Sequence, residues 1–305
     1  MITKKKTNWF KMLFEWKGSV LPQLLPRLCL LFLFSLLIVY FRDFLLKHHI
    51  HLNPAIFTLF GIALAIFLGF RNNVSYDRFW EGRKLWGALL NDTRSLARQA
   101  HTLIEGEDYK PQQTDFIKQL TALVHALKHQ LRNTDADPDL QRLLPNTMAN
   151  SLKNNTFKPI VIMKSLGLWI QNARREGRID SIQQIAFDEN LNKISDIIGG
   201  CERISSTPIP YTYSVLLHRT VYMYCFMLPF GFVESLGWIT PFIIVFVAYT
   251  FTALEAIADE LEDPFGTQPN DLALDAMSEM IENTLAELDD QKISVVQKKQ
   301  NYFIT

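Results

Sequence analysis

The chain has 305 residues, of which 48% are hydrophobic and 20% are charged, and its formal net charge at pH 7 is zero. This balance gives no electrostatic basis for binding nucleic acid, and the length allows one large domain or two small ones. The hydrophobic residues gather in runs at Leu28–Phe41, Pro54–Phe70, Val221–Phe232 and Ile239–Leu254. Such a distribution is typical of a membrane protein rather than a soluble one.

The N-terminal segment 1–20 contains several lysines and lacks the apolar core of a signal peptide. The connection 42–53 carries only two basic residues, Arg42 and Lys47, and the connection 233–238 carries none. The positive-inside rule therefore predicts that residues 1–20 are cytosolic and that both termini are cytoplasmic.

Two transmembrane helices are expected within residues 21–73. The run Leu28–Phe41 is shorter than the roughly 20 residues that span a bilayer, but it extends backward past Arg27 to Leu24, or forward to Phe44–Leu46. The second run, Pro54–Phe70, continues without Pro or Gly into a charged segment that reaches Glu81. We therefore expect one long helix that starts in lipid and ends in water.

His48, His49 and His51 cluster in the loop between these two helices. Imidazoles suit zinc or copper, although an interfacial polar loop is the more ordinary interpretation. The three cysteines, at positions 29, 201 and 225, are too scattered for a disulfide framework or a zinc-binding CxxC motif. No arrangement of side chains points to an enzyme, and we expect neither a cofactor nor a metal site.

Residues 74–210 are expected to form a cytosolic helical region. Apolar side chains recur there at helical spacing, and no segment alternates convincingly as a strand does. Asp137-Pro138 and Pro145 interrupt the helical pattern. The expected helices are Ser75–Ile104, Pro111–Arg132, Lys158–Arg175 and Ile182–Ile204.

Two further transmembrane helices are expected within residues 211–254. The segment Pro208-Ile209-Pro210 precedes them. It is expected to form a rigid elbow, because each proline keeps its predecessor out of the α conformation. Residues 255–305 are expected to hold cytosolic C-terminal helices, one of them at about Asp271–Leu288, and a tail. The predicted fold is an all-α membrane protein with four transmembrane helices plus a cytosolic helical layer.

Carboxylates at Glu255, Asp259 and Asp263 repeat every four residues below the last expected span. Such acids could concentrate cations beside a pathway, but a solvated helix end is the commoner explanation.

Three residues of the second span form one stripe, because Ile62, Ile66 and Phe70 recur every fourth position along the helix. On an arbitrary membrane helix such a stripe packs against a neighbouring span. Around a symmetry axis, copies of it would instead make stacked apolar rings, which constrict a pore and can gate it by dewetting.

Three segments resemble the bestrophin family in its bacterial branch, over nearly the whole chain. They are FRNNVSYDRFWEGR at 70–83, RISSTPIPYTY at 203–213 and ELEDPFGTQPNDL at 260–272, in this order around the expected spans. The resemblance implies a homopentameric ion channel of the bacterial inner membrane, built around a central pore. It also implies that the stripe of Ile62, Ile66 and Phe70 lines the narrow neck of this pore.

A second constriction at the cytosolic mouth is implied by the same resemblance, formed by Ile182 or by its neighbour Ile179. The alternative for either residue is an ordinary isoleucine of the core. Eukaryotic members bind calcium through a run of carboxylates after Pro-Phe-Gly, whereas this chain has Thr267, Gln268, Pro269, Asn270 and Asp271 there. A Ca²⁺ site needs 6–8 oxygen ligands, several of them anionic, so calcium gating by this turn is not expected.

The bacterial branch is associated with monovalent cations, so the resemblance implies sodium-type conduction. Eukaryotic members pass anions, which leaves a chloride or anion channel of the same architecture as the alternative. A non-conducting, membrane-anchored helical scaffold is a third hypothesis. The expected partners are other copies of the chain, the lipid bilayer and the permeant ions, but no nucleic acid.

Overall fold

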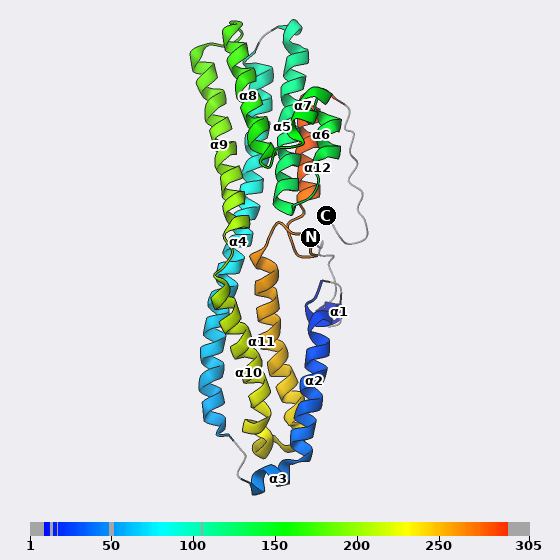
Figure 1. The fold of residues 1–305 in the computed structure, drawn as a ribbon, viewed down its shortest axis with the longest axis vertical. Helices are drawn as coiled ribbons and strands as arrows, with labels where there is room; N and C mark the ends of the chain where they lie inside the picture. The colour runs from blue at the N-terminus through cyan, green and yellow to red at the C-terminus, as the bar shows by residue number, and fades with distance from the viewer. Residues whose placement is uncertain (1–8, 13–14, 17, 49–51, 105, 292–305) are drawn as a thin grey trace. The chain divides into compact units, whose positions relative to one another are not determined.

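The computed structural model describes residues 9–12, 15–16, 18–48, 52–104 and 106–291, and every regular element in these ranges is a helix (Figure 1). The expected all-α class is therefore confirmed. The chain divides into two compact units. We call residues 4–79 and 208–263 the membrane unit, and residues 80–207 and 264–305 the polar unit. The domain limits expected from the sequence at 73, 210 and 254 stay predictions.

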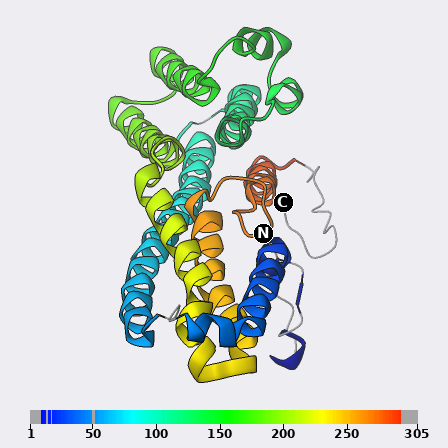
Figure 2. The same ribbon diagram turned by 60° about the horizontal axis from the view of Figure 1, so that its bottom comes forward.

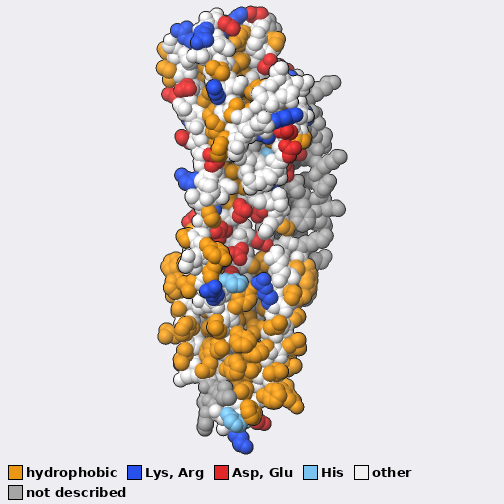
Figure 3. Space-filling view, viewed as in Figure 1, with side chains coloured by type: hydrophobic (Ala, Val, Ile, Leu, Met, Phe, Trp, Pro, Cys, Tyr) orange, Lys and Arg blue, Asp and Glu red, His pale blue; other side chains and the backbone are white. Residues whose placement is uncertain are grey.

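The membrane unit is built around three helices that pack side by side, α2 against α10 and α11, and α10 against α11 (Figure 2). Its buried core includes Leu28, Leu64, Leu68, Val221 and Ile244. Outside this core, apolar side chains cover much of the unit's surface (Figure 3). The elements are α1 (Trp9–Met12), α2 (Leu21–Tyr40), α3 (Arg42–Lys47), the first part of α4 (Pro54–Thr102), α10 (Tyr211–Leu236), a 3-10 turn (Gly237–Ile239) and α11 (Thr240–Glu262).

Three helical stretches among the described residues are long and apolar enough to cross a membrane. They are α2, α4 and the stretch Tyr211–Glu262, which contains α10 and α11. Gly237 lies between these two helices with φ of +53°, a conformation that glycine adopts at little cost. The count of four transmembrane helices stays a prediction.

Helix α4 is a single unbroken element from Pro54 to Thr102, about 74 Å long at 1.5 Å per residue. Asn53 caps its start, since its side-chain oxygen accepts a hydrogen bond from the Ala55 backbone N–H at 2.9 Å. The expectation that the second apolar run continues into the charged segment as one helix is confirmed.

The polar unit contains the rest of α4 and a set of amphipathic helices around α5, which packs against α6, α8, α9 and α12. Proline occupies the first or second position of α5, α6 and α8, where its missing N–H costs no hydrogen bond. The remaining elements are the 3-10 turn Glu107–Tyr109, α5 (Lys110–Arg132), α6 (Asp137–Leu143), α7 (Asn146–Leu152), α8 (Lys158–Arg175), α9 (Ser181–Ser206) and α12 (Leu274–Leu288).

Candidate functional site

Helix α4 presents the apolar stripe on the side opposite to its packed face. Leu64 and Leu68 are buried in the core of the membrane unit, with 3% and 0% of their surface exposed. Residues two positions apart lie about 200° apart around an α-helix, so Ile66 and Phe70 point away from that core. Ile62, Ile66 and Phe70 expose 57%, 53% and 61% of their surface. The structure thus places all three predicted residues on one uncovered face.

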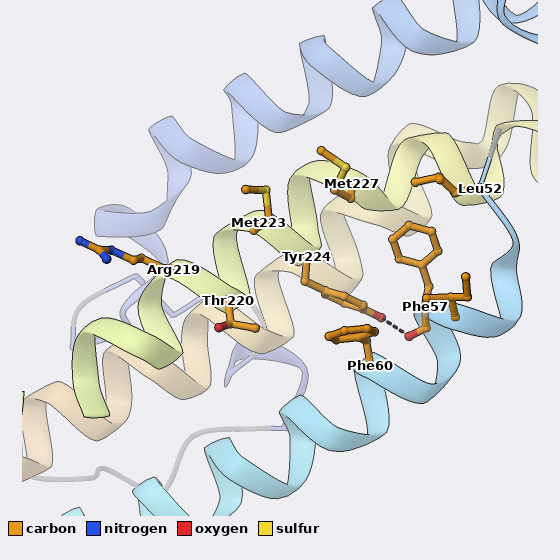
Figure 4. Close-up of a pocket in the computed structure, with 9 residues that line it drawn as sticks. Leu52, Phe57, Phe60, Arg219, Thr220, Met223, Tyr224 and Met227 are labelled. Carbon is orange, nitrogen blue, oxygen red and sulfur yellow. Dashed lines mark hydrogen bonds between the residues drawn. The ribbon is translucent and has the colours of Figure 1, made fainter. Parts of the chain in front are cut away.

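Two tyrosines of α10 hold α4 through its backbone. The Tyr224 hydroxyl donates to the carbonyl oxygen of Phe57 at 3.2 Å, as Figure 4 shows. The Tyr213 hydroxyl donates to the carbonyl oxygen of Phe67, also at 3.2 Å. Gly61 makes this approach possible, because a Cβ atom there would lie 2.7 Å from the Tyr224 oxygen. One bond lies before the stripe along α4 and the other lies within it, between Ile66 and Phe70, and together they fix the rotation of the helix.

An ion-pair junction around the buried Arg71 ties the end of the stripe to α11. The Arg71 side chain, which is 2% exposed, pairs with Asp259, and its Nη2 lies 3.5 Å from Glu262 Oε2. The other carboxylate oxygen of Glu262 accepts from the Ile209 backbone N–H at 3.0 Å. The Glu262 carbonyl accepts from Arg78 Nε at 3.0 Å. The three sequence segments that carried the family resemblance therefore meet at Glu262.

Sequence reasoning missed this junction. It treated Glu255, Asp259 and Asp263 as a solvated helix end, or as acids that concentrate cations. The structure instead buries Glu255, whose carboxylate lies 2.7 Å from His218 Nδ1, and it pairs the exposed Asp259 with Arg71, whereas Asp263 is exposed as on a solvated helix end. The available signal was a lone arginine directly after an apolar run, because a charge at that place needs a partner.

Ile182, one of the two candidates for the cytosolic constriction, lies in the first turn of α9. Asp180 caps this helix, since its side chain accepts from the Gln183 backbone N–H at 2.7 Å. The Gln183 side chain accepts from the Asp180 N–H at 2.8 Å and completes a capping box. Ile182 exposes 77% of its surface, whereas Ile179 exposes 3%. Within one chain, Ile179 is thus a core residue and Ile182 projects outward.

The Pro-Phe-Gly turn is a packed structural element of the polar unit. Phe265 is buried, and a Cβ atom at Gly82 would lie 3.1 Å from its ring. Asp271 is also buried, and its carboxylate accepts from the Gln268 backbone N–H at 2.7 Å. The one carboxylate of the turn is therefore hydrogen-bonded to the backbone of the same turn. Helix α12 starts at Leu274, later than the expected Asp271, because Asp271 belongs to this turn.

No group of three or more metal-binding side chains occurs among the described residues. His48 is exposed, and its Nδ1 lies 2.9 Å from the Phe44 carbonyl oxygen. His49 and His51 lie outside the described residues. The three cysteines are free thiols, and burial raises the pKa of Cys201 to about 12, far from a reactive thiolate.

Comparisons with known proteins agree with one another over nearly the full chain. A family model described as "Bacterial/Fungal Bestrophin protein" matches residues 1–287. A voltage-dependent anion channel-forming protein of Ralstonia nicotianae is 51% identical over 288 residues, which is 94% of each chain. The voltage-dependent anion channel-forming protein YneE of Escherichia coli is 40% identical over 300 residues, or 95% of each chain.

The fold is similar to that of a solved membrane protein. A crystal structure of a bacterial bestrophin homologue from Klebsiella pneumoniae matches with a TM-score of 0.85 and 40% sequence identity. The match covers 88% of this chain and 99% of that chain.

Proposed function

Because the chain belongs to the bestrophin family, we propose that it assembles into a homopentamer that conducts monovalent ions across the bacterial inner membrane, with both termini cytoplasmic. Membership of this family makes the protein a membrane ion channel, not an enzyme. The observation that carries the pore assignment is the exposed stripe on α4. Three large apolar side chains lie uncovered opposite a packed face, on a helix long enough to span the membrane.

In the pentamer, five copies of the stripe form the neck as three stacked apolar rings. A hydrated ion gains no favourable interaction from isoleucine or phenylalanine side chains, so the rings limit conduction when they are narrow or dry. The two tyrosine bonds from α10 and the junction at Arg71 hold α4 in the rotation that presents the stripe. An apolar neck cannot select by charge, and ion sign must come from charges elsewhere.

Ile182 is our candidate for the cytosolic constriction. Its exposure on a capped helix start favours it over Ile179, whose side chain fills the core of its own chain. A capped first turn also holds the side chain in a defined position, as a constriction requires.

Conduction of sodium-type monovalent cations is our first candidate for ion sign. The exposed Asp77 is the first ionisable residue to follow the stripe on the same face of α4, about three turns after Ile66. Five copies would place a ring of carboxylates beyond the neck. A pathway lined by one sign of charge raises the local concentration of the opposite ion, so this ring would favour cations.

Anion conduction is the second candidate, and the relatives favour it. The similar proteins of Ralstonia nicotianae and Escherichia coli are both named voltage-dependent anion channel-forming proteins. The same apolar neck serves either ion, since it carries no charge of its own.

The deciding experiment is the reversal potential of the purified protein in liposomes under asymmetric NaCl. A reversal potential near that of sodium supports the first candidate, one near that of chloride supports the second, and no current contradicts both. Asp77→Asn should weaken cation preference, whereas the exposed Asp115→Asn on α5 should not. Mass measurement in several detergents tests assembly, and a monomer or dimer throughout would contradict the pentamer.

A further inference from the structure

A groove of about 640 Å³ lies between α2 and α10 in the membrane unit, with residues of α11 among its lining. Its walls are apolar along most of the length, where Leu30, Leu31, Met223 and Phe226 line it. At one end the lining changes to basic and aromatic side chains. These are Arg27, His218, Arg219 and Tyr222. Figure 3 shows basic and histidine side chains together beside the apolar surface of the unit.

Two guanidinium groups in this groove lack a carboxylate partner among the described residues. Arg27 donates to the Tyr222 hydroxyl at 2.5 Å and lies over the Tyr222 ring, 5.6 Å from its centre. Arg219 is exposed and has no ion pair within the described part of the chain. The neighbouring acid, Glu255, is engaged by His218 at 2.7 Å. The basic end of the groove therefore carries uncompensated positive charge.

A positive charge beside lipid is costly unless an anion accompanies it. Phospholipid headgroups supply that anion, and arginine binds phosphate oxygens with two parallel hydrogen bonds. Arg27 and Arg219 lie near the starts of α2 and α10, the ends that we expect on the cytoplasmic side. Basic pockets between helices on that side are suited to anionic lipids.

A second apolar groove begins on the other side of α10. Its volume is about 430 Å³, and α4 and α10 line it. Arg219 and Met223 border both grooves. Figure 4 shows this second groove with Arg219 at one end of a row formed by Thr220, Met223 and Met227. A lipid whose phosphate lies at Arg219 could thus place one acyl chain on each side of α10.

We propose that the membrane unit binds an anionic diacyl phospholipid, with the headgroup phosphate held by Arg27 and Arg219 and the acyl chains in the two grooves. The site depends on the membrane position of these helices and not on the ion that the channel conducts. A lipid bound there packs against α10, the helix whose tyrosines hold α4.

Native mass spectrometry of the purified full-length protein tests this proposal, with phosphatidylglycerol and phosphatidylcholine titrated separately. We expect tighter binding of phosphatidylglycerol, and a loss of roughly fivefold in its affinity for each of Arg27→Gln and Arg219→Gln, the usual effect of one basic residue near an anionic lipid surface. Arg98→Gln, at an exposed position of α4 in the polar unit, is the charge-matched control and should bind as the wild type does.

A second variant tests the apolar part of the site. Met223 borders both grooves, so Met223→Trp keeps both arginines but places a larger side chain in the space of the acyl chains. This variant should bind both lipids more weakly, while the assembly keeps its wild-type mass and the protein its helical content. Unchanged phosphatidylglycerol affinity in the double variant Arg27→Gln/Arg219→Gln would overturn the proposal. Loss of subunits from the assembly in that variant, at unchanged lipid affinity, would show that a second copy of the chain occupies the groove instead.

Discussion

His125 of α5 and Glu282 of α12 form a buried pair in which Nε2 of the imidazole lies 2.8 Å from Oε2 of the carboxylate. The other ring nitrogen lies 3.2 Å from an oxygen of Asp139 on α6. Arg142 donates to the second oxygen of Glu282 at 2.5 Å. Three helices of the polar unit therefore converge on one ring, and the docking of α12 depends on the charge of this ring.

The first prediction is that the docking of α12 weakens as the pH rises above neutrality. Burial by itself would lower the pKa of His125, but the carboxylates of Asp139 and Glu282 outweigh it and raise this pKa above 6.5. A raised pKa in the folded state gives stability that is complete below the unfolded value and is lost as the pH passes the folded value. Burial opposes ionisation of Glu282 too, yet His125 and Arg142 hold its pKa at about 2, so its contribution persists down to strongly acidic pH.

Hydrogen exchange of the α12 amides, corrected for the intrinsic pH dependence of exchange, measures this effect. Protection should fall from below to above neutral pH in the wild type. In His125→Gln it should be low throughout and vary little with pH, whereas the exposed-loop control His48→Gln should follow the wild type. Protection that rises with pH in the wild type would contradict the assignment.

The second prediction concerns the neck. Ile66→Ala and Phe70→Ala should each increase single-channel current, because removing the side chain from every subunit widens a ring and makes it easier to wet. Leu64→Ala is the matched control on the buried face and should cost about 2–5 kcal/mol of stability while leaving the current nearly unchanged. If Leu64→Ala enlarges the current and the stripe variants do not, α4 is rotated from our assignment.

The third prediction concerns the cytosolic constriction. Ile182→Ala should change the permeability ratios among monovalent ions without loss of stability, because Ile182 is exposed within its own chain. Ile179→Ala should instead lower the melting temperature and leave these ratios unchanged, because Ile179 is a core residue. Bi-ionic reversal potentials and thermal unfolding in detergent separate the two effects. The opposite pattern would make Ile179 the constricting residue.

The fourth prediction concerns the junction at Arg71. The double variant Asp259→Asn/Glu262→Gln leaves a buried guanidinium without a carboxylate, and such a loss typically costs about 3–5 kcal/mol. Each single variant should cost less than half of this, because the other carboxylate still pairs with Arg71. Thermal unfolding of all three variants measures this non-additivity. Strictly additive losses would show that the two carboxylates act independently.

The fifth prediction is that calcium does not switch the channel. The Pro-Phe-Gly turn has one carboxylate, that of Asp271, and this carboxylate accepts a hydrogen bond within the turn. Ion flux into liposomes should be the same with a chelator and with micromolar calcium. A steep rise of the flux with calcium would show that other residues supply a binding site.

The sequence predicted the helices well because the rules that decide them are local. The absence of Pro and Gly between Phe70 and Glu81 was enough to predict one continuous helix, and α4 is continuous. The expected helix starts at Pro111 and Lys158 lie within one residue of the observed starts of α5 and α8. The periodicity of Ile62, Ile66 and Phe70 also placed them on one face, since helix geometry alone sets that relationship.

What the sequence by itself determined was thus the all-α class, the apolar spans, the stripe and the family. Only the tertiary structure decided that Arg71, Ile209 and Glu262 meet, that His125 pairs with Glu282, and that Ile179 is buried while Ile182 is exposed. The physical reason is that spacing along the chain fixes which side chains share a helix face. Which faces then meet depends on how helices far apart in sequence pack, and local periodicity carries no information about that.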